Sequence, residues 1–190
     1  MNRTEGCGPI SDKPFAAVPA AAGGSTRSPP NAAPELDGVG GGGRLVRMQL
    51  FVGLAAAADH CFATRFASIK LSELAIGIGP FVVGPAVERK LGTSGFSQLT
   101  IDASSWKTAD WAAQYGLYSE VFDSSEKMDL AIDTLAKHLA SSSPAAMSEL
   151  KKVLWSGTEN WDTLLNDRAS ISGRLVLSDF TRKAIQAFNK

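Results

Sequence analysis

The chain has 190 residues, which is enough for one domain with a sizeable hydrophobic core. Lys and Arg together number 19, and so do Asp and Glu, so no net charge favours nucleic acid or a membrane surface as a partner. No apolar run reaches the length of a transmembrane helix. The two cysteines, Cys7 and Cys61, fit no metal or redox spacing, so we expect a reduced, cytoplasmic setting and no metal site.

Residues 1–50 are predicted to be a low-complexity segment without a packed core. Between Ala16 and Gly43, 18 of 28 residues are Ala, Gly or Pro, and Phe15 is the only aromatic residue before Phe51. Such a composition offers little apolar area to offset the entropy lost on folding, so we expect disorder. The glycine run near its end lacks the Gly-Lys-Ser/Thr ending and the preceding strand of a phosphate-binding loop, which excludes that interpretation.

Residues 51–124 have the short alternating elements of an α/β fold. Small apolar residues at 52–59 favour a helix that packs closely on a sheet, and a strand is expected at 60–64. The alternation of apolar residues from Ile69 to Glu73 predicts a second short strand, which the Gly/Pro cluster at 77–80 ends. The remaining predicted elements are helices at 81–90 and 93–103 separated by Gly92, a helix at 108–115 capped by Thr108, and a strand at 117–122.

Residues 125–190 are predicted to be helical. Asp123 followed by Glu126 resembles a capping box before the first of these helices, and His138 falls in its last turn, where a cation is favoured. Ser143 before Pro144 is typical of a helix start. The last helix follows a Ser-Asp cap, and its predicted apolar face comprises Phe180, Ala184, Ile185 and Phe188.

Glu73 is the candidate chemical group. It stands among Leu71, Leu74 and Ile76, immediately before the Gly/Pro turn. A carboxyl group that is partly desolvated there has a raised pKa, which suits it to proton transfer near neutral pH. The alternative from the residues alone is an exposed acid at the end of a strand.

Two motifs in order carry a family resemblance. The run from Val52 to Asp59 corresponds to a helix of the type G-G-G-x-E-L-A-x-x-x-D, and the run from Ile69 to Pro80 corresponds to F-x-x-P-E-x-x-x-G-x-x-P. A later run, Ala112 to Val121, is similar to A-x-x-x-G-L-V-x-x-V. This series resembles the enoyl-CoA hydratase/isomerase family, the crotonase superfamily, over its C-terminal half only and with an atypical N-terminal segment.

The resemblance implies a fold and an organisation. We expect an α/β protein that is mostly helical: a remnant of the crotonase-like ββα spiral core at 51–124, followed by a C-terminal helical region of the trimerisation type at 125–190. The upstream half of the family is replaced by the low-complexity segment 1–50. That replacement predicts a truncated or out-of-frame product joined to a genuine C-terminal half near residue 51.

The resemblance also implies site residues. Glu73 falls on the catalytic glutamate of the second motif. Gly53 stands where hydratases carry their first glutamate, so that acid is absent, and Leu50 stands at the position of an oxyanion-hole amide. Leu71, Pro80 and Phe81 are the predicted substrate-pocket residues. Coenzyme A is part of the substrate, so no separate cofactor is expected.

Two functions follow from these assignments. The first is an enzyme that acts on an acyl-CoA thioester through an enolate-like intermediate, most simply a double-bond isomerase with Glu73 as its acid and base. The second is a non-catalytic fragment or assembly partner. Amphipathic helices that carry Trp155 and Trp161 favour self-association, and the resemblance implies a trimer or a dimer of trimers.

Overall fold

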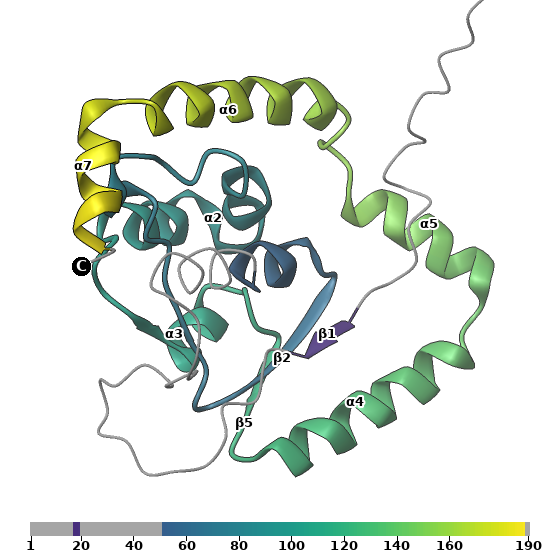
Figure 1. Cartoon of the computed structure of the whole chain (residues 1–190). Coiled ribbons are helices and arrows are strands. Elements are labelled where there is room, and N and C mark those ends of the chain that lie inside the picture. Colours follow the sequence, from purple (N-terminus) through teal and green to yellow (C-terminus); the bar gives the residue numbers. More distant parts are fainter. Residues whose placement is uncertain (1–16, 20–50, 189–190) are drawn as a thin grey trace, which may run out of the picture.

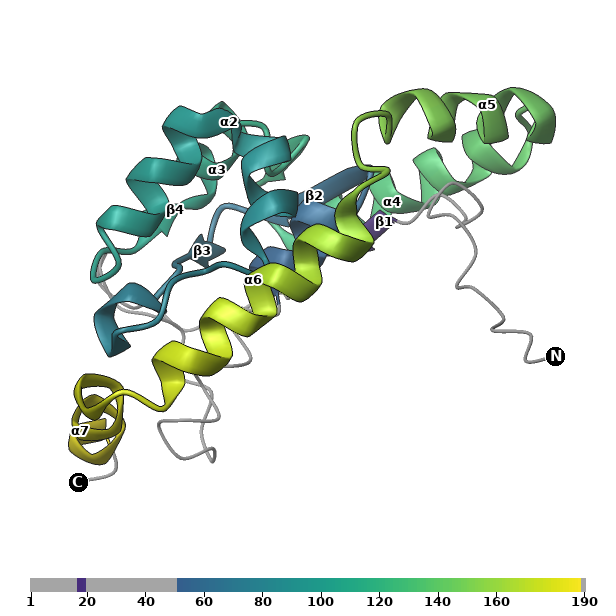
Figure 2. The same ribbon diagram turned by 90° about the horizontal axis from the view of Figure 1, so that it is seen from above.

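A computed structural model describes residues 17–19 and 51–188 of the chain, and Figures 1 and 2 show their arrangement. An α/β core comes first. Four helices, α4 to α7, then form a continuous arm that passes around the outside of this core. The protein is thus mostly helical with few strands, as the sequence predicted. The name "arm" is used below for residues 125–188.

The core is built on a small parallel sheet. Its strand order is β1 (Ala17–Pro19), β2 (His60–Thr64) and β5 (Glu120–Phe122). The register pairs Val18 with Cys61 and Ala63 with Val121. A helix at residues 51–57 leads directly into β2, four of whose five residues are buried. β1 lies inside the segment 1–50 that the sequence predicts to be of low complexity, and the rest of that segment lies outside the described residues.

The predicted strand around Glu73 is shorter than expected. β3 (Ser68–Ile69) pairs antiparallel with β4 (Lys107–Thr108) and ends at Ile69. A 3-10 helix, η2 (Leu74–Ile76), follows, and Gly77 closes it in the left-handed conformation at φ 81°. The alternating pattern was therefore misleading beyond Ile69, because the chain there turns on itself instead of pairing. The predicted strand at 117–122 is likewise limited to β5.

Two helices of the core follow the predicted breaks and caps. α2 (Gly84–Ile101) has Pro85 in its first turn, where the missing N–H is tolerated, and a non-helical residue at Gly92 that separates two helical segments. α3 (Ala109–Gln114) is capped by Thr108, whose hydroxyl accepts a hydrogen bond from the backbone N–H of Trp111 at 3.2 Å. Both the break at Gly92 and the Thr108 cap confirm the sequence prediction.

The arm consists of α4 (Ser125–Ala140), α5 (Pro144–Leu154), α6 (Trp161–Val176) and α7 (Asp179–Phe188). Ser143 caps α5 as predicted, and His138 lies in the last turn of α4. The cap of α4 is Ser124, not Asp123. The Asp123 carboxylate instead pairs with Arg65, 3.1 Å away.

The apolar core joins the helix at 51–57, β2, β3, α2 and α3. It excludes most of the arm, since α6 has no buried residue and Met128 is the one buried residue of α4. The buried cluster comprises Val52, Ala55, Ala56, Cys61, Ala63, Ile69, Leu71, Val87, Leu91, Leu99, Ala109, Ala112, Leu117 and Tyr118.

The arm is fastened to the core by a buried ion pair. Asp59, which ends the segment between the helix at 51–57 and β2, accepts a hydrogen bond from Lys151 Nζ at 2.5 Å and from Trp155 Nε1 at 2.6 Å. The two charged side chains are 5% and 6% exposed. Arg89 lies over the Trp155 ring, 4.4 Å from its centroid, and Lys90 Nζ donates to the Asp59 carbonyl. We call these five residues the Asp59 cluster.

Removing the cation from this cluster should destabilise the protein strongly. Lys151→Met leaves the Asp59 carboxylate buried without its charge partner, which typically costs about 3–5 kcal/mol of unfolding free energy. Lys152→Met is a matched control, because Lys152 forms an exposed pair with Glu149 and such pairs contribute about 0–1 kcal/mol. Urea denaturation of both variants measures the difference. Equal losses would show that the buried pair does not anchor the arm.

Candidate functional site

Glu73 lies in a tight turn of residues 72–78, called here the Glu73 turn. Its backbone is helical, at φ −59° and ψ −40°. Its carbonyl oxygen accepts two hydrogen bonds, from the N–H groups of Ile76 at 3.2 Å and Ile78 at 2.9 Å, and Ala75 donates to Ser72 at 3.1 Å. These bonds close the turn on Glu73 itself, so the direction of its side chain is set by the conformation of the whole turn.

The Glu73 carboxyl group is buried and incompletely hydrogen bonded. The residue is 8% exposed, and Oε2 has no hydrogen-bond partner among the described residues. Burial raises the pKa of this carboxyl above its ordinary value, and a hydrogen bond from its own backbone amide only partly opposes the rise. A buried polar atom without a partner is uncommon in folded proteins and calls for an explanation such as a functional role. The alternative of an exposed strand-end acid is wrong.

The predicted pocket residues differ in their surroundings. Leu71 is 1% exposed and belongs to the core cluster. Pro80 is buried and Phe81 is partly exposed. A Cβ atom at Gly79 would lie 2.6 Å from the Phe81 ring, so the turn before Phe81 requires glycine. Whether these residues contact a substrate stays a prediction.

The structure describes Gly53, the predicted first-glutamate position, but not Leu50, the predicted oxyanion position. Gly53 lies in the helix at 51–57, and a Cβ atom there would be 3.2 Å from Val83 Cγ1. The position expected for a first glutamate therefore packs against the segment that follows Phe81, and a side chain there would displace Val83. Leu50 lies outside the described residues.

The arm contacts the Glu73 turn, which the sequence did not predict. α7 packs on η2, and Thr181, at 0% exposure, is buried there. The predicted apolar face of α7 is only partly right, since Phe180 is 66% and Ile185 40% exposed. The spacing Ser178-x-x-Thr181, typical of a side-chain cap, was the available signal for this start, but no local pattern identifies the partner of a buried threonine.

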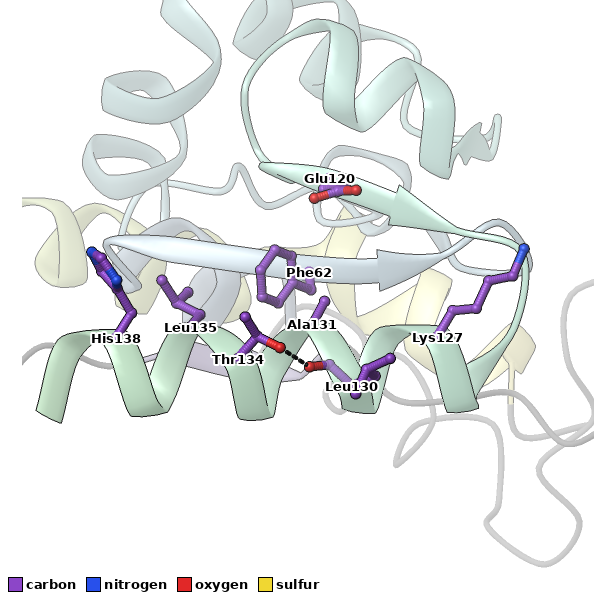
Figure 3. A pocket seen from close by; sticks show the side chains of 8 residues that line it. All are labelled: Phe62, Glu120, Lys127, Leu130, Ala131, Thr134, Leu135 and His138. Atoms are coloured by element: carbon purple, nitrogen blue, oxygen red, sulfur yellow. Dashed lines mark hydrogen bonds between the residues drawn. The ribbon is translucent and has the colours of Figure 1, made fainter. Parts of the chain in front are cut away.

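A groove elsewhere in the molecule includes none of the predicted site residues. It lies between β2, β5 and α4 and has a volume of about 490 Å³ (Figure 3). Phe62, Leu130, Ala131 and Leu135 give it apolar walls, and Lys127 and His138 stand at its two ends. Within residues 17–19 and 51–188 there is no group of three or more His, Cys, Asp or Glu residues that could hold a metal ion.

Among the described residues, 17–19 and 51–188, no helix is both long enough and apolar enough to cross a membrane. His60 forms an edge-to-face contact with Phe62, with the two ring centroids 4.7 Å apart. Burial lowers the pKa of His60, and the nearby Lys90 cation adds to this effect. The imidazole is thus a packed, neutral side chain near neutral pH.

A comparison with known protein families identifies the family to which the chain belongs. A family model described as enoyl-CoA hydratase/isomerase matches residues 51–189. The chain therefore belongs to the enoyl-CoA hydratase/isomerase family, and the resemblance drawn from its motifs is confirmed. A search of curated proteins gives no match.

Solved structures share the fold. An enoyl-CoA hydratase from Mycobacterium avium is 26% identical with a TM-score of 0.67, and the match covers 73% of this chain and 54% of that one. An enoyl-CoA hydratase/isomerase from Pseudoalteromonas atlantica is 16% identical with a TM-score of 0.66, over 73% of this chain and 56% of that one. The chain thus spans about half the length of these relatives, in agreement with a partial crotonase-like fold.

The raised pKa of Glu73 predicts how stability depends on pH. A carboxyl whose pKa is higher in the folded than in the unfolded state stabilises the fold fully below the unfolded value, near 4.5, and loses this contribution as pH rises through the folded value. Glu73→Gln cannot ionise, so its unfolding free energy relative to the parent should increase as pH rises above 4.5. Denaturant titrations between pH 4 and about 8 measure this.

Glu126→Gln is a control variant whose stability relative to the parent should change with pH in the opposite direction. A hydrogen bond from Ser124 lowers the pKa of Glu126, so its ionised form stabilises the fold above the unfolded pKa, and the variant should lose stability over the same pH range. Parallel pH profiles for Glu73→Gln and the parent would contradict the burial of the Glu73 carboxyl.

Proposed function

We propose that the chain supplies part of a site for acyl-CoA thioesters, with Glu73 as the group that moves the proton once an upstream half completes that site. The observation that carries the proposal is the Glu73 carboxyl itself: buried, raised in pKa, and with Oε2 lacking a partner among the described residues. Membership of the enoyl-CoA hydratase/isomerase family supports the substrate class. The thioester brings its own coenzyme A, so no separate cofactor is needed, and the proposed setting is the cytoplasm.

The proposed reaction is double-bond isomerisation. Glu73 removes a proton from C2 of a 3-enoyl-CoA, and an enolate forms whose oxygen is held by backbone N–H donors. The same carboxyl group then returns the proton at C4. The absence of an acid at Gly53 favours this route over hydration, because hydration in this family typically uses two glutamates. Leu50 is the proposed source of one oxyanion donor, with Pro80 and Phe81 beside the acyl chain.

Substitution of Glu73 tests the proposal. Residues 51–190 can be joined to the upstream half of the Mycobacterium avium hydratase to give a chain of full family length. In this chimera Glu73→Gln keeps the shape of the side chain and removes its proton, so kcat for isomerisation should fall about 10²–10⁴-fold with KM little changed. Glu120→Gln, on β5, is a matched control and should leave kcat unchanged.

Three results of the same assays decide between the alternatives. Near-parent rates in Glu73→Gln would exclude Glu73 as the proton carrier. Faster hydration of a 2-enoyl-CoA than isomerisation of a 3-enoyl-CoA would exclude the isomerase. The chain without the added upstream half should be nearly inactive in both assays, because the first oxyanion donor has no counterpart in it.

A second candidate function is that of an assembly partner. The arm carries several exposed apolar side chains, which support a contact with other subunits. Trp155 does not contribute to this surface, because it is buried in the Asp59 cluster. Its ring packs edge-to-face on that of Trp161, with the two ring centroids 5.9 Å apart. Trp155 is therefore not a basis for self-association, contrary to the prediction from the sequence. The exposed large apolar residues of the arm are Leu130, Leu150, Val153, Leu154, Val176, Leu177, Phe180 and Ile185.

We expect the chain to form a trimer through the arm. Light scattering at micromolar concentration should give three times the chain mass of 20.0 kDa. Val153→Asp places a charge on the exposed face of α5 and should shift the mass towards that of a monomer. Ile101→Asp, at a comparably exposed position on α2, should not. A monomeric parent protein would contradict the proposed assembly.

A further inference from the structure

α7 packs directly on the Glu73 turn at Gly77. A Cβ atom at Gly77 would lie 2.4 Å from Phe180 Cδ1 and 2.9 Å from Thr181 Oγ1, both closer than real Cβ contacts. Gly77 also has a left-handed φ of 81°, which disfavours other residues. Any other residue at this position is therefore disfavoured for two independent reasons, the left-handed backbone conformation and the closeness of α7.

The start of α7 is fixed where it meets the turn. Ser178 Oγ accepts a hydrogen bond from the Thr181 backbone N–H at 3.2 Å and donates one to Thr181 Oγ1 at 3.1 Å. The Ser178 carbonyl accepts from the N–H of Arg182 at 3.0 Å. Thr181 is fully buried, and its hydroxyl cannot rotate away without losing the hydrogen bond that Ser178 Oγ donates to it.

A displacement of Gly77 would reach Glu73 through the backbone. The Gly77 N–H donates to the Leu74 carbonyl at 3.0 Å, and the next residue, Ile78, donates to the Glu73 carbonyl at 2.9 Å. The Ile76 N–H also donates to the Glu73 carbonyl, and together these three hydrogen bonds close the turn. The contact with α7 therefore lies within a few bonds of the backbone that sets the direction of the Glu73 side chain.

We infer that Phe180 and Thr181 are positioning residues for Glu73, and that α7 holds the Glu73 turn closed by packing on Gly77. The consequence for proton transfer rests on the proposed function, whereas the packing does not. Figures 1 and 2 both place α7 at the end of the arm, far along the chain from the turn it supports.

Three variants of the full chain test this: Gly77→Ala, Phe180→Ala and the double variant. The first readout is hydrogen exchange of the Ile76 and Ile78 amides, which report closure of the turn. The second is the pKa of the Glu73 carboxyl, followed by carbon NMR with Glu73→Gln to assign the signal. Phe66→Ala is the matched control, because Phe66 is also an exposed phenylalanine, at 64% against 66% for Phe180.

Each single variant should increase exchange of the two amides about tenfold or more and move the pKa of Glu73 towards its ordinary value, with the exchange of α4 amides unchanged. Phe180→Ala removes the ring that an added Cβ would meet, so the effects in the double variant should be smaller than their sum. Phe66→Ala should resemble the parent.

Strictly additive effects, or parent-like exchange in either single variant, would overturn the inference. The same measurements distinguish a failure of this inference from a failure of the proposed function. If Glu73 titrates at its ordinary pKa in the parent protein while the amide effects remain non-additive, then α7 supports the turn and the proton-transfer proposal is contradicted.

Discussion

The buried carboxylate of Asp59 is the constraint on which the arrangement of the chain depends. A carboxylate taken out of water is costly unless it is paired and hydrogen bonded, and Asp59 lies where the first helix of the core gives way to β2. Its partners, Lys151 and Trp155, are about ninety residues further along the chain. The chain must therefore bring α5 back to the core, and this requirement sets the position of the middle of the arm.

The arm has a second point of attachment at its far end. Between the Asp59 cluster and α7 runs α6, which has no buried residue and so contributes little packing of its own. α7 is held where Thr181 meets Gly77 in the Glu73 turn. The arm thus connects an ion pair at one side of the core to the candidate catalytic turn at the other, and both attachments are needed to define where α7 lies.

Local features were predictable from the sequence, and long-range ones were not. The Thr108 and Ser143 caps and the break at Gly92 depend on residues a few positions apart, which a sequence displays directly. The family was also identified, because its motifs are local, and the apolar neighbours of Glu73 predicted the burial of its carboxyl group. The use of Asp123 by Arg65, the burial of Trp155 against Asp59, and the pairing of β1 with β2 all depend on partners far along the chain. The strand prediction failed beyond Ile69 because alternation cannot distinguish pairing from a closed turn.

The surroundings of Glu73 explain why one carboxyl group would suffice for the proposed chemistry. A Cβ atom at Gly53 would lie 3.2 Å from Val83 Cγ1, so a second acid there would need a small shift of Val83, and the proposed single-carboxyl mechanism rests on the glycine at this position. Isomerisation needs only a single group that accepts a proton and then gives it back. A buried carboxyl with a raised pKa holds its proton more firmly than a solvated one, and this narrows the gap between its pKa and that of the carbon acid. Oε2 is buried and has no hydrogen-bond partner among the described residues, whereas the backbone carbonyl of the same residue accepts two hydrogen bonds. The backbone of Glu73 therefore closes the turn, and its carboxyl oxygen Oε2 takes no part in doing so.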